Sequence, residues 1–378
     1  MNRIKRLYVS YHGRKVGTMA LYKEHFAAFE YDQEWIADGF AISPFSLPLE
    51  QRVFMPKMEP FEGIFGVFAD SLPDGWGRLL VDRFLLKNHI NPKETGNLNR
   101  LAIVGNSGMG ALTYEPDLHY EQEETNMEWD KIAAECSKIL QAKESKNLDE
   151  LFRLGGSSGG ARPKILINLD GEAWIVKFPA SEDEGWAGIQ EYEYSMCAKE
   201  CGICMEETRL FPSELCEGYF GTKRFDRKRK AGGVTERIHM LSVSAILETS
   251  HRIPNLDYDI LMRLTLELTK DYSELEKLYR LMCFNVFAHN RDDHSRNFTY
   301  LYDELEGCWR LSPAYDLTYS YSLGGEHATM VHGNGRDPGL TDLLAVAKNA
   351  GINERRAKRI AQEIQECVNE RLARWLRK

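Results

Sequence analysis

The chain has 378 residues, and its 48 lysines and arginines against 57 aspartates and glutamates leave a formal net charge of −9. Hydrophobic residues make up 43% of the sequence and aromatic residues 11%, which is typical of a folded globular protein and excludes wholesale disorder. The acidic balance argues against a protein whose whole surface binds nucleic acid. No run of about 18 apolar residues predicts a membrane-spanning helix, and the length predicts two or three domains.

Eight cysteines are scattered along the chain without the spacing of a disulfide framework. Cys201 and Cys204 form the one CxxC pair, but no second such pair or nearby pair of histidines completes a zinc motif. A redox role would need a thioredoxin-like context. We therefore expect reduced, mostly buried thiols and, because no apolar signal core follows the basic N-terminus, a cytoplasmic protein.

The first stretch of the chain, residues 1–115, has the alternating pattern of β-strands. Two alternating runs flank a His12-Gly13 turn and predict a β-hairpin. The glycines between 105 and 110 lack the Lys-Ser/Thr ending of a phosphate loop, so they predict turns or a β-bulge. The predicted elements are strands at 6–11, 16–21 and 27–31 and a helix at 76–86.

The second stretch, residues 116–227, begins in an acidic, loop-rich segment and predicts a small α+β lobe. The third, residues 228–378, predicts a helical lobe, because its apolar residues recur at helical spacing. In the second stretch we expect helices at 129–142 and 189–200 and strands at 164–169, 172–178, 208–211 and 219–225.

Four glycines and two serines lie within the six residues from Gly155 to Gly160. Such a loop can turn several backbone N–H groups toward one anion, and the missing side chains let a polyphosphate approach closely. It is not a Walker A loop, because Lys164 follows Pro163 without a Ser/Thr and a strand comes next. Taken by itself, the loop is as compatible with a hairpin or a linker as with a phosphate-binding loop.

Lys177 lies in the apolar strand 174–178. Kinases place a strand lysine on the α- and β-phosphates and pair it with a glutamate on a helix. Glu191 or Glu193, on the following predicted helix, could be this partner. The alternative is an exposed lysine on an edge strand.

The most specific pattern is the segment 288–298, in which Asp292 precedes Asn297 by five residues directly after a helix. Phosphoryl transfer needs a carboxylate near the attacking hydroxyl and an amide oxygen on magnesium, and kinases supply both from one loop at this spacing. Asp316 then follows an apolar strand, in the position of a second metal ligand. A polar turn explains any one of these features, but not all of them in this order.

Together these motifs resemble the HipA family, the toxin kinases of bacterial type II toxin–antitoxin modules. The resemblance covers essentially the whole chain. It implies an α+β fold with a β-rich N-terminal subdomain (1–115), a kinase-like α+β N-lobe (116–227) and an all-helical C-lobe (228–378). The resembling segments are 68–74 and 108–112 in the N-terminal subdomain, 157–164 in the phosphate loop, and 292–298 and 312–317 in the catalytic and metal loops.

Carried over by position, the resemblance makes Asp292 the catalytic base and Asn297 and Asp316 the ligands of Mg2+. Ser157, or Ser158 beside it, matches a serine that such kinases autophosphorylate. A phosphate there would add about −1.5 to −2 charge to the loop meant for ATP and should switch the enzyme off. The residues implied to bind ATP are Ser158, Gly159, Gly160, Ala161, Arg162, Lys164, Lys177, Lys223, Arg224, Phe225, His294 and Tyr315.

The resemblance also implies a serine/threonine kinase that arrests growth by phosphorylating a protein, with an aminoacyl-tRNA synthetase as one candidate. Its partner would be a small helix-turn-helix antitoxin, like HipB, through which operator DNA is mainly reached, and no membrane is involved. Two other functions stay open: an aminoglycoside-type small-molecule phosphotransferase and a non-catalytic co-repressor with a kinase fold. The basic run at 224–230 predicts a solvated turn or, alternatively, a contact to nucleic acid or an acidic partner.

Overall fold

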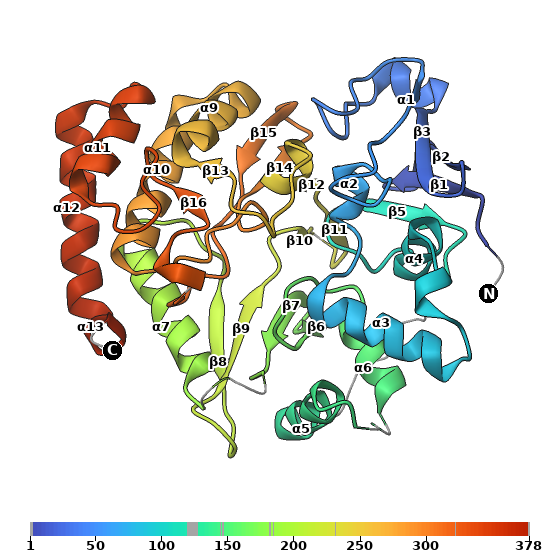
Figure 1. Cartoon of the computed structure of the whole chain (residues 1–378), viewed down its shortest axis with the longest axis horizontal. Helices are drawn as coiled ribbons and strands as arrows, with labels where there is room; N and C mark the ends of the chain where they lie inside the picture. The colour runs from blue at the N-terminus through green and yellow to red at the C-terminus, as the bar shows by residue number, and fades with distance from the viewer. Residues whose placement is uncertain are drawn as a thin grey trace. The chain divides into compact units, whose positions relative to one another are not determined.

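The computed structural model describes residues 3–118, 128–143, 145, 147–180, 183, 185–230, 232–321 and 323–376. The chain forms two compact units (Figure 1). The first unit comprises Met1–Gly185 and Phe211–Thr249, and the second comprises Trp186–Leu210 and Ser250–Lys378. Neither unit is therefore a continuous piece of the sequence.

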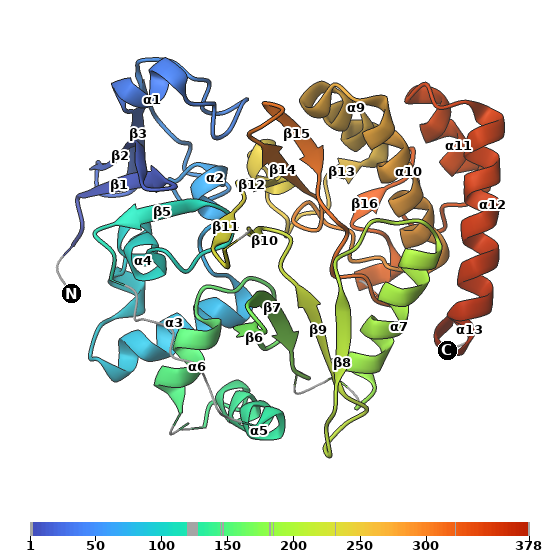
Figure 2. The same ribbon diagram turned by 180° about the vertical axis from the view of Figure 1, so that it is seen from behind.

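The first unit opens with a five-stranded sheet in the order β4-β3-β2-β1-β5 (Figure 2). β1 pairs antiparallel with β2 across a two-residue turn of His12 and Gly13, both with positive φ. Such turns match the twist of the strands they join, and this one confirms the predicted hairpin. The strands are β1 (Arg6–Tyr11), β2 (Arg14–Tyr22), β3 (Phe26–Tyr31), β4 (Val53–Phe54) and β5 (Leu112–Glu115).

A second antiparallel sheet of the first unit contains β6, β7 and β9 in that order. β6 turns into β7 at Asp170 and Gly171, where the sequence predicts the turn. β8 (Thr208–Phe211) spans the boundary between the two units. The other strands are β6 (Lys164–Leu169), β7 (Glu172–Lys177), β9 (Tyr219–Lys223), the paired β10 (Arg227–Arg229) and β11 (Thr235–Arg237), and β12 (Met240–Ser242).

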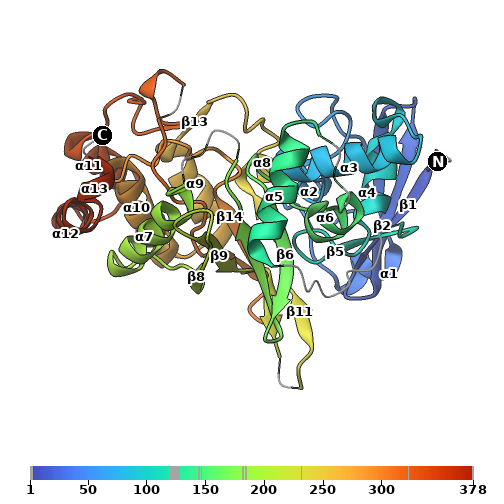
Figure 3. The same ribbon diagram turned by 90° about the horizontal axis from the view of Figure 1, so that it is seen from below.

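Helices of the first unit lie against this second sheet (Figure 3). Buried side chains of these helices and strands form one hydrophobic cluster. The cluster joins Trp76 and Leu80 of α3, Phe152 of α6 and Val176 of β7. Each such buried side chain contributes about 1.5–3 kcal/mol of stability. The helices are α1 (Gln33–Asp38), α2 (Gly66–Ala69), α3 (Gly75–Lys87), η1 (Pro92–Glu94), α4 (Asn97–Val104), α5 (Trp129–Leu140), α6 (Leu148–Gly155) and α8 (Val243–Ile246).

The second unit is mainly helical, and α12 packs along α10, α11 and α7 (Figures 1 and 2). The buried face of α12 repeats at helical spacing through Ile360, Ile364 and Val368, as predicted. Its helices are α7 (Ala187–Glu200), α9 (Tyr258–Thr269), α10 (Tyr272–Phe287), η2 (Leu323–Gly325), α11 (Leu340–Asn349), α12 (Glu354–Arg371) and α13 (Ala373–Leu376).

The second unit is not wholly helical, however. The antiparallel pair β14 (Thr299–Asp303) and β15 (Cys308–Leu311) follows α10, and β13 (Leu256–Asp257) pairs in parallel with β16 (Thr329–Met330). These short strands were not part of the expected all-helical C-lobe, and they hold the loops that carry Asp292 and Asp316. No helix in the described ranges is long and apolar enough to cross a membrane.

Candidate active site

The glycine-rich loop of the first unit is shorter than its sequence suggests. α6 continues to Gly155, and a Cβ on Gly155 would lie 2.6 Å from the carbonyl oxygen of Lys164. This glycine therefore permits close packing of helix on strand. The freely accessible part of the loop is Gly160 and Ala161, which are exposed.

The tip of the loop rests on the N-terminal end of α3, in the same unit. Gly160 donates its N–H to the carboxylate of Asp74, and its carbonyl oxygen accepts from the N–H of Trp76 at 2.9 Å. A Cβ on Gly77 would lie 2.1 Å from the carbonyl oxygen of Ser158, so only glycine allows this approach. No motif in the sequence indicates that residues 74–77 support the loop.

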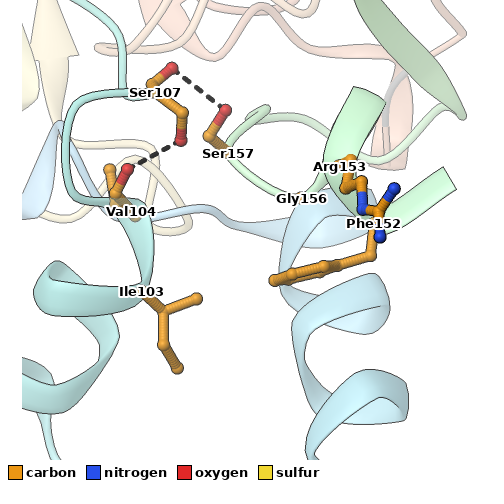
Figure 4. A pocket seen from close by; sticks show the side chains of 7 residues that line it. All are labelled: Ile103, Val104, Ser107, Phe152, Arg153, Gly156 and Ser157. Carbon is orange, nitrogen blue, oxygen red and sulfur yellow. Dashed lines mark hydrogen bonds between the residues drawn. The ribbon is translucent and has the colours of Figure 1, made fainter. Parts of the chain in front are cut away.

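The two loop serines differ in their surroundings. Ser157 is 8% exposed, and its hydroxyl donates to the carbonyl oxygen of Ser107 at 3.1 Å. Ser158 is 2% exposed, and its hydroxyl donates to the carbonyl oxygen of Gly155 at 2.6 Å, at the end of its own helix. Ser157 thus borders a small surface pocket (Figure 4), whereas the hydroxyl of Ser158 bonds to the end of α6. The pocket is lined by Ile103, Val104, Ser107, Phe152, Arg153, Gly156 and Ser157.

Two lysines lie opposite each other on the strands that follow the loop. Lys164 of β6 pairs with Lys177 of β7 in the sheet register. The ammonium group of Lys164 reaches the loop tip, because a Cβ on Gly160 would lie 2.6 Å from its Nζ. The ammonium group of Lys177 lies 5.7 Å from the ring of Phe220. The fold thus gathers two cations and the loop in the first unit.

Three residues are predicted to contact adenine. Lys223 is the last residue of β9, and Arg224 and Phe225 directly follow it. Lys223 lies over the ring of Trp174, at 5.9 Å. The Arg224 side chain is buried and donates to Asp226 from Nε at 2.9 Å and from Nη2 at 2.8 Å. Arg224 therefore has a structural role through its ion pair with Asp226, independent of any contact to a nucleotide.

Asp226 is the centre of a buried ionic cluster. Arg227 donates to its carboxylate at 2.7 Å, and the N–H of Gly110 does so at the same distance. Burial by itself raises the pKa of Asp226, but Arg224 and Arg227 hold it well below its ordinary value. The basic run is thus not one solvated turn: Arg224 is buried, Arg227 is half-buried, and Lys228, Arg229 and Lys230 are exposed.

The loop with Asp292 and Asn297 is closed by its own hydrogen bonds. The side-chain nitrogen of Asn297 donates to the carbonyl oxygen of Asp292 at 2.7 Å, and its backbone N–H donates to the carbonyl oxygen of His294 at 2.8 Å. The Asp292 side chain is 61% exposed, with the Nε2 of His294 3.8 Å from its Oδ1. The loop presents one accessible carboxylate beside an amide whose orientation is fixed.

Asp293, the next residue, has the opposite environment. Its carboxylate is fully buried and accepts hydrogen bonds from the Tyr258 hydroxyl at 2.9 Å and the Thr329 N–H at 3.1 Å. The Nδ1 of His327 lies 3.0 Å from the same carboxylate. Asp293 thus anchors the loop to α9 and β16 while Asp292 stays accessible. The sequence motif does not distinguish these two neighbours by function.

Asp316 lies in a loop that is tied to the same segment. The hydroxyl of Tyr315 lies 2.7 Å from that of Thr299 and donates to the carbonyl oxygen of Arg296 at 2.5 Å. Asp316 itself adopts a φ of 57°, an uncommon conformation for a non-glycine residue that is concentrated at functional sites. Asn297 and Asp316 offer amide and carboxylate oxygens, the hard ligands that Mg2+ prefers.

Buried polar atoms without partners also concentrate around this loop. In the described part of the chain, five buried side-chain atoms have no hydrogen-bond partner, and three belong to the segment 290–295. Such atoms cost free energy, and they call for a water, an ion or a functional role. The three are Asn290 Oδ1, Arg291 Nε and Ser295 Oγ.

The predicted site residues therefore form two groups, one in each unit. The first unit carries the loop, Lys164, Lys177 and residues 223–225, and the second carries Asp292, His294, Asn297, Tyr315 and Asp316. Of the two glutamates proposed as partners of Lys177, Glu193 accepts from the indole N–H of Trp375 at 2.7 Å. Glu191, also on α7, is 3% exposed.

Family models match both parts of the chain. The model of the HipA N-terminal domain matches residues 7–115. The model of the HipA-like C-terminal domain matches residues 156–372, which is more than half of the chain.

Individual proteins resemble the chain over nearly its whole length. The putative kinase Y4mE of Sinorhizobium fredii is 26% identical over 412 residues, covering 99% of this chain and 92% of that protein. The structure of HipA from Shewanella oneidensis MR-1, solved with HipB and operator DNA, has a TM-score of 0.72 at 15% identity, covering 97% of this chain and 90% of that chain. This likeness confirms the predicted α+β fold.

The kinase CtkA of Helicobacter pylori is more distant. It has a TM-score of 0.37 at 12% identity, covering 56% of this chain and 90% of that chain. A likeness at this level carries no argument about fold or function.

Proposed function

Because this chain belongs to the HipA family, we propose that it is a cytoplasmic, ATP- and Mg2+-dependent protein serine/threonine kinase. The observation that carries the proposal is the pair of neighbouring aspartates in the second unit. Asp293 is buried and anchored, which leaves the exposed Asp292 beside a fixed Asn297. Its relative from Sinorhizobium fredii, named a putative kinase, supports the same activity.

In this proposal, Asp292 orients the hydroxyl of the substrate and accepts its proton as the oxygen bonds to the γ-phosphorus and ADP leaves. Asn297 and Asp316 hold Mg2+, which when bound neutralises charge on the transferring phosphate. In the first unit, Lys177, Lys164 and the residues from Ser158 to Arg162 bind the phosphates of ATP. His294, Tyr315 and residues 223–225 complete the nucleotide site.

The side chain of Asp292 is 61% exposed, so the hydroxyl of a protein substrate can reach its carboxylate. An aminoacyl-tRNA synthetase is the candidate target, and its phosphorylation would arrest growth. The test is incubation of the purified protein with radiolabelled ATP, Mg2+ and cell extract. A labelled protein that disappears with Asp292→Asn supports the proposal.

Glu306→Gln is the matched control for this experiment, because it removes the charge of an exposed carboxylate in the β14–β15 turn of the same unit. It should label the target like the wild type. A labelled small molecule would instead identify an aminoglycoside-type phosphotransferase. ATP binding or labelling that is absent altogether would favour a non-catalytic co-repressor.

Autophosphorylation is proposed at Ser157 rather than Ser158. The Ser157 hydroxyl borders a pocket, whereas Ser158 is more buried and its hydroxyl bonds to its own helix end. Phosphate at Ser157 must displace the bond to Ser107 and bring negative charge into the ATP loop, which would lower ATP affinity. Phosphopeptide mapping of Ser157→Ala and Ser158→Ala tests the choice, since only the first should lose the phosphate.

The partner that we propose is a small helix-turn-helix antitoxin that neutralises the kinase and carries it to operator DNA. The solved relative from Shewanella oneidensis is a complex of HipA with HipB and operator DNA. A net charge of −9 agrees with DNA contact mainly through a partner. A gel shift with operator DNA should therefore need the antitoxin, and a shift by this chain alone would contradict the proposal.

A further inference from the structure

Three cysteines far apart in the sequence meet inside the second unit. Cys197 lies on α7, Cys201 caps the same helix, and Cys367 lies on α12. Their sulfur atoms all lie within 4.8 Å of one another, and those of Cys197 and Cys367 are 4.0 Å apart. In the part of the chain that the structure describes, no other three residues among His, Cys, Asp and Glu bring ligand atoms this close together.

The spacing of the sulfurs fits metal coordination better than a disulfide. Sulfurs bound to one zinc ion at about 2.3 Å in tetrahedral geometry lie about 3.8 Å apart. A disulfide needs a sulfur–sulfur distance of about 2.05 Å. The Cys197 and Cys367 sulfurs, at 4.0 Å, would thus have to move by nearly half their separation to form a bond, but hardly at all to share an ion.

Basic side chains lie close to the three sulfurs, and the charge of Arg371 acts on the thiol of Cys197. Arg371 is held in place by Glu200, 2.7 Å away. Arg280 of α10 donates to the carbonyl oxygen of Cys201 at 3.3 Å. Two arginines therefore stand near a cluster that becomes negative when it ionises.

We propose that Cys197, Cys201 and Cys367 bind one soft metal ion, Zn2+ or Cu+, as a three-thiolate site that joins α7 to α12. Each thiol gives its proton to solvent when it coordinates, and the sulfurs are neither oxidised nor reduced. Cys367 is half-buried whereas the other two are buried, so the ion enters from the side of α12.

The test is metal binding by the whole chain, reduced, stripped of metal and kept free of oxygen. Cd2+ is the spectroscopic probe, because its bonds to thiolates absorb in the ultraviolet. Competition against chromophoric chelators specific for Zn2+ and Cu+ then distinguishes the two ions. We expect one equivalent of metal per chain and a saturable charge-transfer band.

Cys201→Ser and Cys367→Ser should each weaken binding at least about 100-fold, since loss of an outer-sphere contact alone costs about 10–100-fold. Cys367 is half-buried, so Cys367→Ser should fold even if the substitution of the buried Cys201 impairs folding. Circular dichroism verifies the fold of both variants. Cys204→Ser is the matched control, because Cys204 is exposed, lies three residues from Cys201 and is outside the cluster. It should bind like the wild type.

Other results overturn the proposal. Binding that does not saturate at one equivalent, or that falls as much with Cys204→Ser as with Cys201→Ser, would mean that the cluster is not the site. A bond between two of the three sulfurs that forms in air, in a protein that takes up no metal, would instead identify a redox pair.

Discussion

The glycine loop of the first unit and the Asp292 loop of the second are held in opposite ways. The contact that sets the Asp292–Asn297 pair is local, because Asn297 bonds to Asp292 five positions away, and the buried Asp293 ties this loop to Tyr258 and Thr329. The tip of the glycine loop rests on residues far away in the sequence, with Gly160 bonded to Asp74 across 86 positions. A contact between close neighbours can be recognised from a short motif, whereas support from distant residues cannot.

The largest expected effect tests the Asp292 loop. Asp292→Asn should lower the rate of phosphoryl transfer by roughly 10^2–10^4-fold, because it removes the proposed base while keeping size and shape. Its thermal stability should stay close to that of the wild type, since the side chain is 61% exposed. Initial rates and thermal unfolding measured on the same samples test both statements. Undiminished transfer would assign the base to another residue.

The neighbouring substitution should act on stability instead. Asp293→Asn replaces a buried carboxylate that has contacts to Tyr258, His327 and Thr329. The loss of this charge should lower the free energy of unfolding by about 3–5 kcal/mol. Urea unfolding of Asp292→Asn and Asp293→Asn side by side gives the comparison. If the two variants were equally stable, Asp293 would not anchor the loop as we infer.

Acid should lower the free energy of unfolding of the first unit. His239 is buried there, and its ring nitrogen contacts the carbonyl oxygen of Ile42 at 2.8 Å. Burial lowers the pKa of His239 to about 4, so the folded protein holds it neutral while the unfolded chain takes up a proton below pH about 6.5. The stability that the neutral His239 contributes is therefore complete above pH 6.5. The free energy of unfolding falls by about 3 kcal/mol as the pH drops to 4.

Urea unfolding at several pH values measures this loss. His239→Gln cannot take up the proton, and its stability should vary less between pH 6.5 and 4. An identical slope in the variant and the wild type would assign the acid sensitivity to other groups.

The smallest expected effect tests the loop held from a distance. Gly77→Ala should push Ser158 and the glycine loop away from α3, costing about 1–3 kcal/mol and weakening ATP binding. Gly96→Ala is the control, because a Cβ there meets nothing within 4 Å. Nucleotide titration and unfolding of both variants give the result. Equal ATP affinity in the two would mean that the support from α3 does not matter to the loop.

The local elements and the order of the motifs can be predicted from the sequence without knowledge of the fold. The hairpin of β1 and β2, the β6–β7 turn and the buried face of α12 all follow from residue periodicity and turn chemistry, which act over a few positions. The resemblance to the HipA family followed from motif order in the same way, and the family models support it independently.

The residues that share an environment become known only from the folded chain. In the sequence, Cys201 forms a CxxC pair with Cys204, three positions away. In the folded chain, Cys204 is exposed and Cys201 lies close to Cys197 and Cys367. The folded chain likewise buried Asp293 beside an exposed Asp292, and it set Gly160 on Asp74. Such contacts depend on how helices and strands far apart in the chain pack together, and no periodicity along the sequence records that packing.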